Sequence, residues 1–271
     1  MFSAISGLKT HQIMLDVVAN DIANVNTVGY KGGRTTFKDS LSQLQTGATA
    51  PGGGQAGANA AQVGLGVQLG AIDNVMNNGA FQSTGNVTDV AIQGDGWFRV
   101  GSGTPPALPA SFQYTRAGNF TFNALGDLTT QDGYYVVGRT AAGGGTDTYL
   151  NVPPGSSDVA IGQDGALSYI PSGGGARVTA GFISLSGFAN EAGLQRVAGN
   201  RWLESPASGA ATVGTPGGNF GTTVSGTVEM SNVDLATEFT EMISAQRGFQ
   251  ANSRAISVSD EMLQELVNLK R

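Results

Sequence analysis

Apolar residues recur at every seventh position at both ends of the chain. The N-terminal series consists of Met1, Leu8, Leu15 and Ile22, with Ala4, His11, Val18 and Val25 on the second inward position of the same heptads. The C-terminal series consists of Leu235, Met242, Phe249, Ile256 and Leu263. Strict seven-residue spacing is typical of helices that wind around partner helices. The pattern predicts one helix over residues 1–26 and another over residues 231–271, both packed against partners.

The second helix has its own start signal and an unusual length. Ser231 and Asp234 have the spacing of a capping box, which makes Ser231 the expected N-cap. Acidic residues follow near the start, and Lys270 and Arg271 stand at the end, as the helix dipole favours. The 41 residues from Ser231 to Arg271 would span roughly 60 Å as a helix. Part of this helix is therefore expected to project from a domain of this size.

Apolar residues outside the main seam favour assembly over a closed monomer. An ordinary antiparallel helix pair would be the simpler interpretation. The off-seam residues are Phe239, Ile243, Val258, Met262 and Val267. One partner helix could not cover both faces, whereas further copies of the chain could. The predicted assembly interface consists of Leu8, Leu15, Val18, Ile22, Val25, Leu235, Phe239, Met242, Phe249, Ile256, Leu263 and Leu266.

The sequence between the helices is turn-rich and β-like. A second, shorter helix is expected from Arg34 to Leu44, followed by a flexible Gly/Ala-rich segment from Thr46 to Gln62. Short apolar segments then alternate with glycine-containing turns, as in a β domain. The expected fold is α+β, with terminal helices that form a coiled-coil-like inner domain and a central all-β domain. The expected parts are residues 1–45 (N-terminal helical part), 46–89 (extended linker and first strands), 90–225 (β-rich outer domain) and 226–271 (C-terminal helix).

Composition and charge exclude several classes of function. The net charge is −6, and residues 46–230 contain six arginines and no lysine against eleven carboxylates, so the basic surface of a nucleic-acid-binding protein is missing. Cysteine is absent and His11 is the only histidine, which removes disulfides, thiolate nucleophiles and Cys/His zinc sites. No segment has the length and apolarity of a membrane span. No cleavable signal peptide is evident at the N-terminus.

Candidate chemistry is sparse. Units such as Asp132-Gly133 and Asp164-Gly165 carry a single aspartate each, whereas a calcium loop needs several carboxylates; type I′ hairpin turns are the favoured interpretation. His11 is expected to be a packed or interfacial residue, with a pH-sensitive contact as the alternative. The other isolated acidic candidates are Glu191, Glu204 and Asp158. We expect no enzyme activity, no catalytic residue, no metal site and no cofactor.

Four segments of the chain resemble one protein family. Residues 15–31 (LDVVANDIANVNTVGYK) resemble the N-terminal signature of the bacterial flagellar rod and hook proteins. The tail from Ser231 to Leu269, which contains AQRGFQANS at residues 245–253, resembles their C-terminal signature. Between these, residues 89–98 and 114–120 are similar to landmarks of the family's β domain. The segments occur in the family's order and reach both ends of the chain.

The resemblance implies a structural subunit that polymerises helically. The terminal helices would form the inner core of a tube around a channel, and the β domain would form an outer layer. The tail is most similar to hook proteins, which implies a short form of the curved, flexible hook that transmits torque from rod to filament as a universal joint. The alternative is a distal rod subunit that forms a straight, stiff tube. The length of the chain favours this alternative, because many hook proteins carry an extra outer domain.

The resemblance also implies partners and a location. The expected partners are further copies of the chain, the flagellar rod and hook–filament junction proteins, the hook cap during assembly, and the flagellar type III export apparatus. The expected location is the flagellar hook and basal body outside the cell, reached without signal-peptide cleavage. A secreted glycine-rich adhesin is the interpretation from a different class. Such a protein would act as a monomer through its β domain without the terminal helices.

Overall fold

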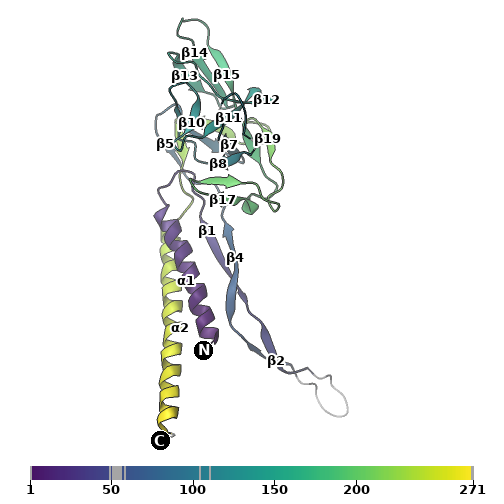
Figure 1. The fold of residues 1–271 in the computed structure, drawn as a ribbon, viewed down its shortest axis with the longest axis vertical. Coiled ribbons are helices and arrows are strands. Elements are labelled where there is room, and N and C mark those ends of the chain that lie inside the picture. The colour runs from purple at the N-terminus through teal and green to yellow at the C-terminus, as the bar shows by residue number, and fades with distance from the viewer. Residues whose placement is uncertain are drawn as a thin grey trace. The chain divides into compact units, whose positions relative to one another are not determined.

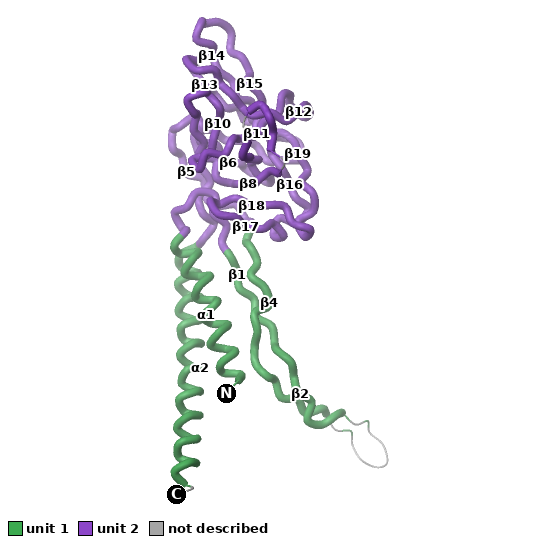
Figure 2. Tube along the Cα trace, viewed as in Figure 1, with its two compact units in different colours: residues 1–23, 33–75, 234–271 green, residues 24–32, 76–233 purple. Residues whose placement is uncertain are grey.

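The elements follow the order helix, strands, helix (Figure 1), which confirms the predicted α+β class. The computed structural model describes residues 2–48, 50, 57, 59–103, 105–109 and 111–269. The features predicted at Met1, Lys270 and Arg271 lie outside these residues. The described chain forms two compact units (Figure 2). Unit 1 comprises residues 1–23, 33–75 and 234–271, and unit 2 comprises residues 24–32 and 76–233.

Unit 1 contains both terminal helices, α1 (Phe2–Ala23) and α2 (Leu235–Leu269), which run side by side (Figure 1). They are antiparallel, because Gly7 of α1 faces Asn252 of α2 whereas His11 faces Gly248. The heptad spacing therefore predicted both helices correctly. The first helix ends three residues earlier than the sequence suggested.

The start of α2 differs from the prediction. The helix begins at Leu235, and Asp234 is its N-cap: Oδ1 of Asp234 accepts a hydrogen bond from the Ala236 N–H at 3.0 Å. The other carboxylate oxygen accepts a hydrogen bond from the Thr237 hydroxyl at 3.1 Å. The prediction of Ser231 as N-cap is wrong, because its hydroxyl accepts only from the Val233 N–H, before the helix starts. A carboxylate at this position also suits the positive end of the helix.

The helix predicted from Arg34 to Leu44 is also wrong, because this segment forms strands. β1 (Gly33–Asp39) pairs antiparallel with β4 (Val67–Asn74), and β2 (Ser42–Thr46) pairs with β3 (Ala61–Gly64). The two pairs follow each other along one two-stranded ribbon. Residues 35–37 are Thr-Thr-Phe, and β-branched and aromatic side chains favour a strand over a helix. The strand partner lies some thirty residues away, which local periodicity does not reveal.

Unit 2 is built from short antiparallel strands around one large sheet. The central path through this sheet runs β13-β14-β15-β11-β7-β8-β18-β17. The strands of the unit are β5 (Phe81–Ser83), β6 (Val90–Gln93), β7 (Trp97–Gly101), β8 (Gln113–Thr115), β9 (Phe120–Phe122), β10 (Leu128–Thr130), β11 (Tyr135–Ala141), β12 (Gly144–Tyr149), β13 (Ser157–Ile161), β14 (Ala166–Ile170), β15 (Val178–Ile183), β16 (Leu185–Gly187), β17 (Gln195–Val197), β18 (Arg201–Leu203), β19 (Thr212–Gly214), β20 (Thr222–Ser225) and β21 (Thr227–Glu229). Two further pairs, β20 with β6 and β21 with β5, join the last strands of the unit to its first.

Two clusters of buried side chains form the interior of unit 2. The larger cluster consists of Val90, Ile92, Phe98, Val100, Phe120, Leu128, Val136, Leu150, Val152, Ile161, Leu167, Ile183 and Leu185. The smaller cluster consists of Trp97, Tyr114, Leu194 and Trp202, with the two tryptophan rings edge to face at 5.7 Å. Central strands such as β7, which is buried at every position, give unit 2 a core of its own.

The Asp132-Gly133 unit is a hairpin turn, but of a different type from the one predicted. In the turn before Tyr134, the Gly133 N–H donates to the Thr130 carbonyl at 2.9 Å, and the Thr130 N–H donates to the Tyr134 carbonyl at 2.8 Å. Gly133 has a φ of 80°, whereas Asp132 is not among the residues with positive φ. This is the three-residue loop with glycine at the left-handed position, not the type I′ turn that needs two positive φ angles.

Candidate functional site: an assembly surface on the terminal helices

Small residues let α1 and α2 approach closely within unit 1. A methyl group on Gly248 would lie 2.5 Å from the His11 ring, so only glycine leaves room for this side chain. Ala245 of α2 and Val18 of α1 are buried, Val18 with 2% of its surface exposed. Gly248 was not among the predicted interface residues. A glycine inside a helix costs about 1 kcal/mol relative to alanine. Its presence within the C-terminal helical pattern was therefore a sign in the sequence of a close helix contact.

His11 is packed inside unit 1. Its ring lies edge-on to Phe37 of β1, with the ring centroids 5.9 Å apart. Its Nδ1 is buried and has no hydrogen-bond partner among the described residues. The structure thus places the lone histidine as a packed side chain that joins α1, α2 and the ribbon.

Two carboxylates meet where α1 ends and α2 begins. Asp21 is buried, and its Oδ2 accepts a hydrogen bond from the Gly33 N–H at 2.9 Å. Glu238 of α2 is half-buried, with Oε2 shielded from solvent and unpartnered among the described residues. Burial raises the pKa of Glu238 to about 7, and the charges of Asp21, Glu241 and Asp234 act in the same direction. The start of α2 is therefore sensitive to the protonation of Glu238.

A large apolar surface of α2 is left uncovered by the residues that the structure describes. We call it the α2 apolar surface, and it consists of Leu235, Phe239, Ile243, Phe249, Val258, Met262, Leu263, Leu266, Val267 and Leu269. Given the antiparallel register, α1 starts opposite about residue 257 of α2, and α2 continues beyond it (Figure 1). Every residue from 260 to 269 is exposed. Leu266, for example, is 63% exposed. Apolar patches of this extent mark interaction sites.

The predicted interface residues fall into three groups. The buried or half-buried ones, which face other elements of unit 1, are Leu8, Leu15, Val18, Ile22, Met242 and Ile256. The exposed ones are Leu235, Phe239, Phe249, Leu263 and Leu266. Val25 lies in a turn of unit 2 after α1 has ended, so it is not on the helical seam. The heptad seam thus mixes contacts inside the subunit with surface that is free for other subunits.

The ribbon of unit 1 adds a second exposed apolar area. Its exposed side chains are Phe37, Leu41, Leu44, Val63, Leu65 and Ile72. A two-stranded ribbon is marginally stable in water unless another element covers it. Near its middle, where β1 and β4 give way to β2 and β3, the ribbon is held to α1: the Ser6 hydroxyl accepts a hydrogen bond from the Val67 N–H at 3.3 Å. The outer part of the ribbon is therefore also a candidate contact surface.

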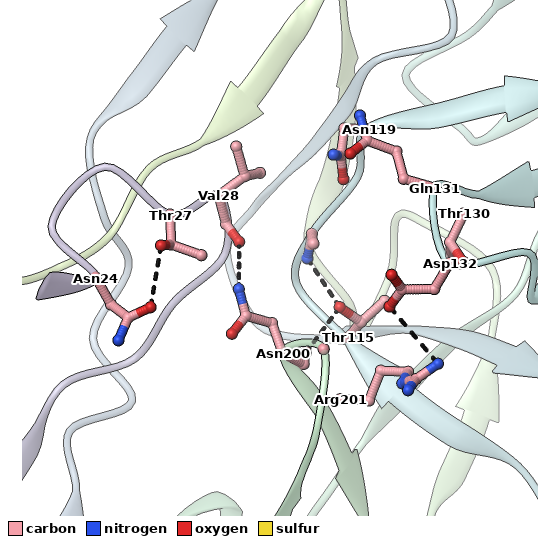
Figure 3. A pocket seen from close by; sticks show the side chains of 12 residues that line it. Asn24, Thr27, Val28, Thr115, Asn119, Thr130, Gln131, Asp132, Asn200 and Arg201 are labelled. Carbon is pink, nitrogen blue, oxygen red and sulfur yellow. Dashed lines mark hydrogen bonds and ion pairs between the residues drawn. The ribbon is translucent and has the colours of Figure 1, made fainter. Parts of the chain in front are cut away.

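Unit 2 contains a polar cavity of about 510 Å³ (Figure 3). Its lining consists of Asn24, Thr27, Val28, Thr115, Ala117, Asn119, Thr130, Gln131, Asp132, Gly199, Asn200 and Arg201. Much of the polar lining is already paired. The Thr27 hydroxyl donates to Asn24 Oδ1 at 3.1 Å, the Asn200 amide donates to the Val28 carbonyl, and Arg201 lies 3.7 Å from Asp132. These bonds hold turns together, and the lining offers no nucleophile beside a base.

Known proteins match the chain from end to end. Family models match residues 1–31 (flagella basal body rod protein), 91–169 (flagellar hook protein FlgE/F/G D1 domain) and 224–269 (flagellar basal body rod FlgEFG protein C-terminal). A flagellar basal-body rod protein FlgG from Bacillus subtilis is 47% identical over 273 aligned residues, which cover 100% of this chain and 98% of that protein. The chain belongs to the flagellar rod and hook protein family. It is a structural subunit of the flagellar axis, as the resemblance implied.

Relatives within the family favour a rod subunit over the hook subunit that the tail of the sequence suggested. A FlgG rod protein from Agrobacterium fabrum is 37% identical, covering 96% of this chain and 94% of that protein. A flagellar hook protein FlgE from Borreliella burgdorferi is 27% identical over 443 aligned positions, which cover 100% of this chain and 99% of that protein. Because 443 positions exceed the 271 residues of this chain, the hook protein has long segments without a counterpart here. None of the described helices is both long and apolar enough to cross a membrane.

Proposed function

We propose that this chain is a distal rod subunit, which polymerises helically into a straight, stiff tube. The observation that carries the proposal is the match over the full chain to basal-body rod proteins named FlgG, at up to 47% identity in the relatives described above. The hook relative matches more weakly and only across long gaps. The length of this chain thus favours the rod, whereas the sequence of its C-terminal segment favoured the hook.

The α2 apolar surface supplies the contact for polymerisation. α1 covers one face of α2 near its middle, but nothing among the described residues covers residues 260–269. Six apolar side chains between Val258 and Leu269 would remain in water in a monomer. Helices of neighbouring copies would bury them, and repetition of one such contact around an axis builds a helical tube. The exposed ribbon residues would add a second contact between copies.

The subunit would be exported to the flagellar axis and would contact other proteins there. Its neighbours would be further copies of itself and the adjoining rod and hook proteins of the flagellar axis. Secretion through the flagellar export apparatus would deliver it without cleavage of a signal peptide. The hook cap and the hook–filament junction proteins belong to the hook interpretation and are not proposed here.

Labelling of purified flagella tests the proposal. An epitope inserted between Gly173 and Gly174, in the exposed turn between β14 and β15, disturbs no core contact. In the bacterium that encodes this chain, the tagged copy would replace the natural one. Hook–basal bodies would then be imaged by cryo-electron microscopy with bound antibody fragments. We expect label along the straight rod segment next to the hook. Label along the curved hook would contradict the rod assignment and restore the hook.

A further inference from the structure

The chain passes between its two units at four peptide connections. These follow Ala23, Gly32, Val75 and Val233. Three segments beside these connections come together inside unit 2: residues 29–32, 77–80 and 229–232. Every covalent path between the units runs through the four connections. The bonds that hold these three segments therefore determine how firmly the connecting chain is attached to unit 2.

Glu229 lies in the third segment and binds the other two through its carboxylate. The side chain is fully buried. Its Oε1 accepts hydrogen bonds from Lys31 Nζ at 2.6 Å and from the Gly79 N–H at 2.9 Å. Its Oε2 lies 3.3 Å from Nη1 of Arg116. Its backbone carbonyl accepts a hydrogen bond from the Gly29 N–H at 2.8 Å.

A second layer of bonds surrounds this carboxylate. Lys31 Nζ also donates to the Asn77 carbonyl at 2.9 Å. The Asn232 side chain accepts from the Gly32 N–H at 2.8 Å and donates to the Asn77 carbonyl at 3.0 Å. A methyl group on Gly79 would lie 2.0 Å from the Met230 carbonyl, so the backbones of these two segments are in direct contact. The three segments are therefore cross-linked by side chains and backbone together.

The charges make the cluster depend on Glu229. Lys31 and Arg116 are 1% exposed, and Glu229 is the acidic partner of both. Burial lowers the pKa of Lys31, and the charge of Glu229 counteracts this effect. Removal of one partner from a buried ion pair leaves an uncompensated charge and is strongly destabilising. Loss of the Glu229 carboxylate would leave both buried cations without their paired carboxylate.

We infer that Glu229, with Lys31 and Arg116, forms the mechanical joint at which unit 2 grips the chain that leads to the terminal helices, so that load passes between the β domain and the helices through this cluster. The inference rests on the proposed function, in which the subunit is part of a tube that carries torque. Within each subunit, these three residues would carry that load. A single buried carboxylate that joins its own connecting segment to the two others concentrates the resistance of the joint in one residue.

Hydrogen exchange on the dilute full-length chain tests the joint. In the Glu229→Gln variant we expect the Gly29, Gly32 and Gly79 amides to exchange at least about tenfold faster, because local opening becomes easier. Amides of β11 and β15 should be unaffected. The matched control is Asp147→Asn, which removes a carboxylate bound to Arg99 and Arg139 inside the sheet. Equal exchange in parent and Glu229→Gln, or the same acceleration in the control, would overturn the inference.

Two additions keep the experiment decisive. If Glu229→Gln fails to fold, Lys31→Met retains the Glu229–Arg116 pair and should still speed exchange at Gly79.

In cells, rotation of a large attached bead measures the motor under high load. We expect Glu229→Gln cells to lose rotation under high load while they still rotate small beads, whereas Asp147→Asn cells match the parent under both loads. Loss at both loads in both variants would show a general folding defect instead. The exchange result does not depend on whether the subunit lies in rod or hook, so it survives failure of the proposed function.

Discussion

Single residues decide how closely the two terminal helices approach. Gly248 leaves space for the His11 ring, and the ring in turn reaches Phe37 of the ribbon. The heptad pattern predicted that His11 points inward, but it gave no sign of which residue lies opposite. A contact between positions that are 237 residues apart depends on the register of two helices, and periodicity alone does not define a register.

The first prediction concerns this contact. Gly248→Ala adds a methyl group 2.5 Å from the His11 ring. The gain in helix propensity is about 1 kcal/mol, but overpacking costs roughly 1–3 kcal/mol, so we expect a lower free energy of unfolding. In the double variant His11→Ala/Gly248→Ala the overlap is gone, and the two effects should not add. Urea unfolding followed by circular dichroism at 222 nm measures Gly248→Ala, His11→Ala and the double variant. Additive effects would show that the helices do not touch at this point.

The second prediction concerns the pH dependence of α2. The pKa of Glu238 is about 7 in the folded chain against 4.5 for an ordinary glutamate. Between these pH values the folded state binds more protons than the unfolded state. The free energy of unfolding therefore falls as the pH rises from about 4.5 to about 7. We expect Glu238→Gln to flatten this slope, while Glu261→Gln, exposed on the same helix, leaves it unchanged. Urea unfolding between pH 4.5 and pH 8 would show equal slopes in all variants if Glu238 were not the group responsible.

At the scale of elements, the structure shows which sequence signals were sufficient. The two helices followed from heptads sustained over several turns, because a long periodic pattern outweighs local exceptions. The ribbon did not follow, because β1 depends on hydrogen bonds from β4, and its Thr-Thr-Phe run was the only local sign of a strand. The start of α2 was misplaced by four residues, because both Ser231 and Asp234 are suitable caps and packing decides between them.

The third prediction tests the uncovered end of α2. Leu266→Asp places a carboxylate on the α2 apolar surface, beyond the reach of α1. Because Leu266 is exposed in the monomer, its stability should stay within about 0.5 kcal/mol of the parent. In a polymer the same carboxylate would be buried without a partner, at a cost on the order of several kcal/mol per subunit. We expect polymerisation to fail in light scattering and electron microscopy of negatively stained samples.

The control for this variant is Asn268→Asp. Residues 266 and 268 lie on opposite sides of an α-helix, about 200° apart. This control adds the same charge to the same segment, outside the α2 apolar surface. Tubes from Leu266→Asp, or equal failure of both variants, would mean that this end of α2 is not a subunit contact.

At the scale of the whole molecule, the chain builds its units from segments that are distant in sequence. Unit 2 includes residues 24–32 and extends to residue 233, whereas composition and turn spacing suggested a contiguous domain over residues 90–225. Lys31 and Glu229 are 198 residues apart in the chain yet 2.6 Å apart in the structure. Lys31 and Arg116 stood out as parts of family signatures, but Glu229 did not, because one carboxylate in a short strand has no visible partner in sequence.

The fourth prediction compares two fragments that follow these two boundaries. Residues 24–233 contain all of unit 2, whereas residues 90–225 lack β5, β21 and the 29–32 segment. In the shorter fragment Arg116 has lost Glu229, its paired carboxylate. Loss of one partner of a buried pair costs roughly 3–5 kcal/mol, so its melting temperature should be lower by about 10 °C or more. Differential scanning calorimetry measures both fragments, and equal melting temperatures would support the contiguous domain.

A substitution at Arg116 distinguishes the loss of the ion pair from the mere loss of chain. In the 24–233 fragment, Arg116→Met should lower the melting temperature, because Glu229 then keeps only Lys31 as a charged partner. In the 90–225 fragment the same substitution should change the melting temperature little, because the carboxylate partner of Arg116 is already absent. The effect of the substitution thus depends on the presence of Glu229. A decrease in both would show that Arg116 acts through its packing against Trp97, and that the cluster around Glu229 does not bind the distant segments of unit 2 through charge.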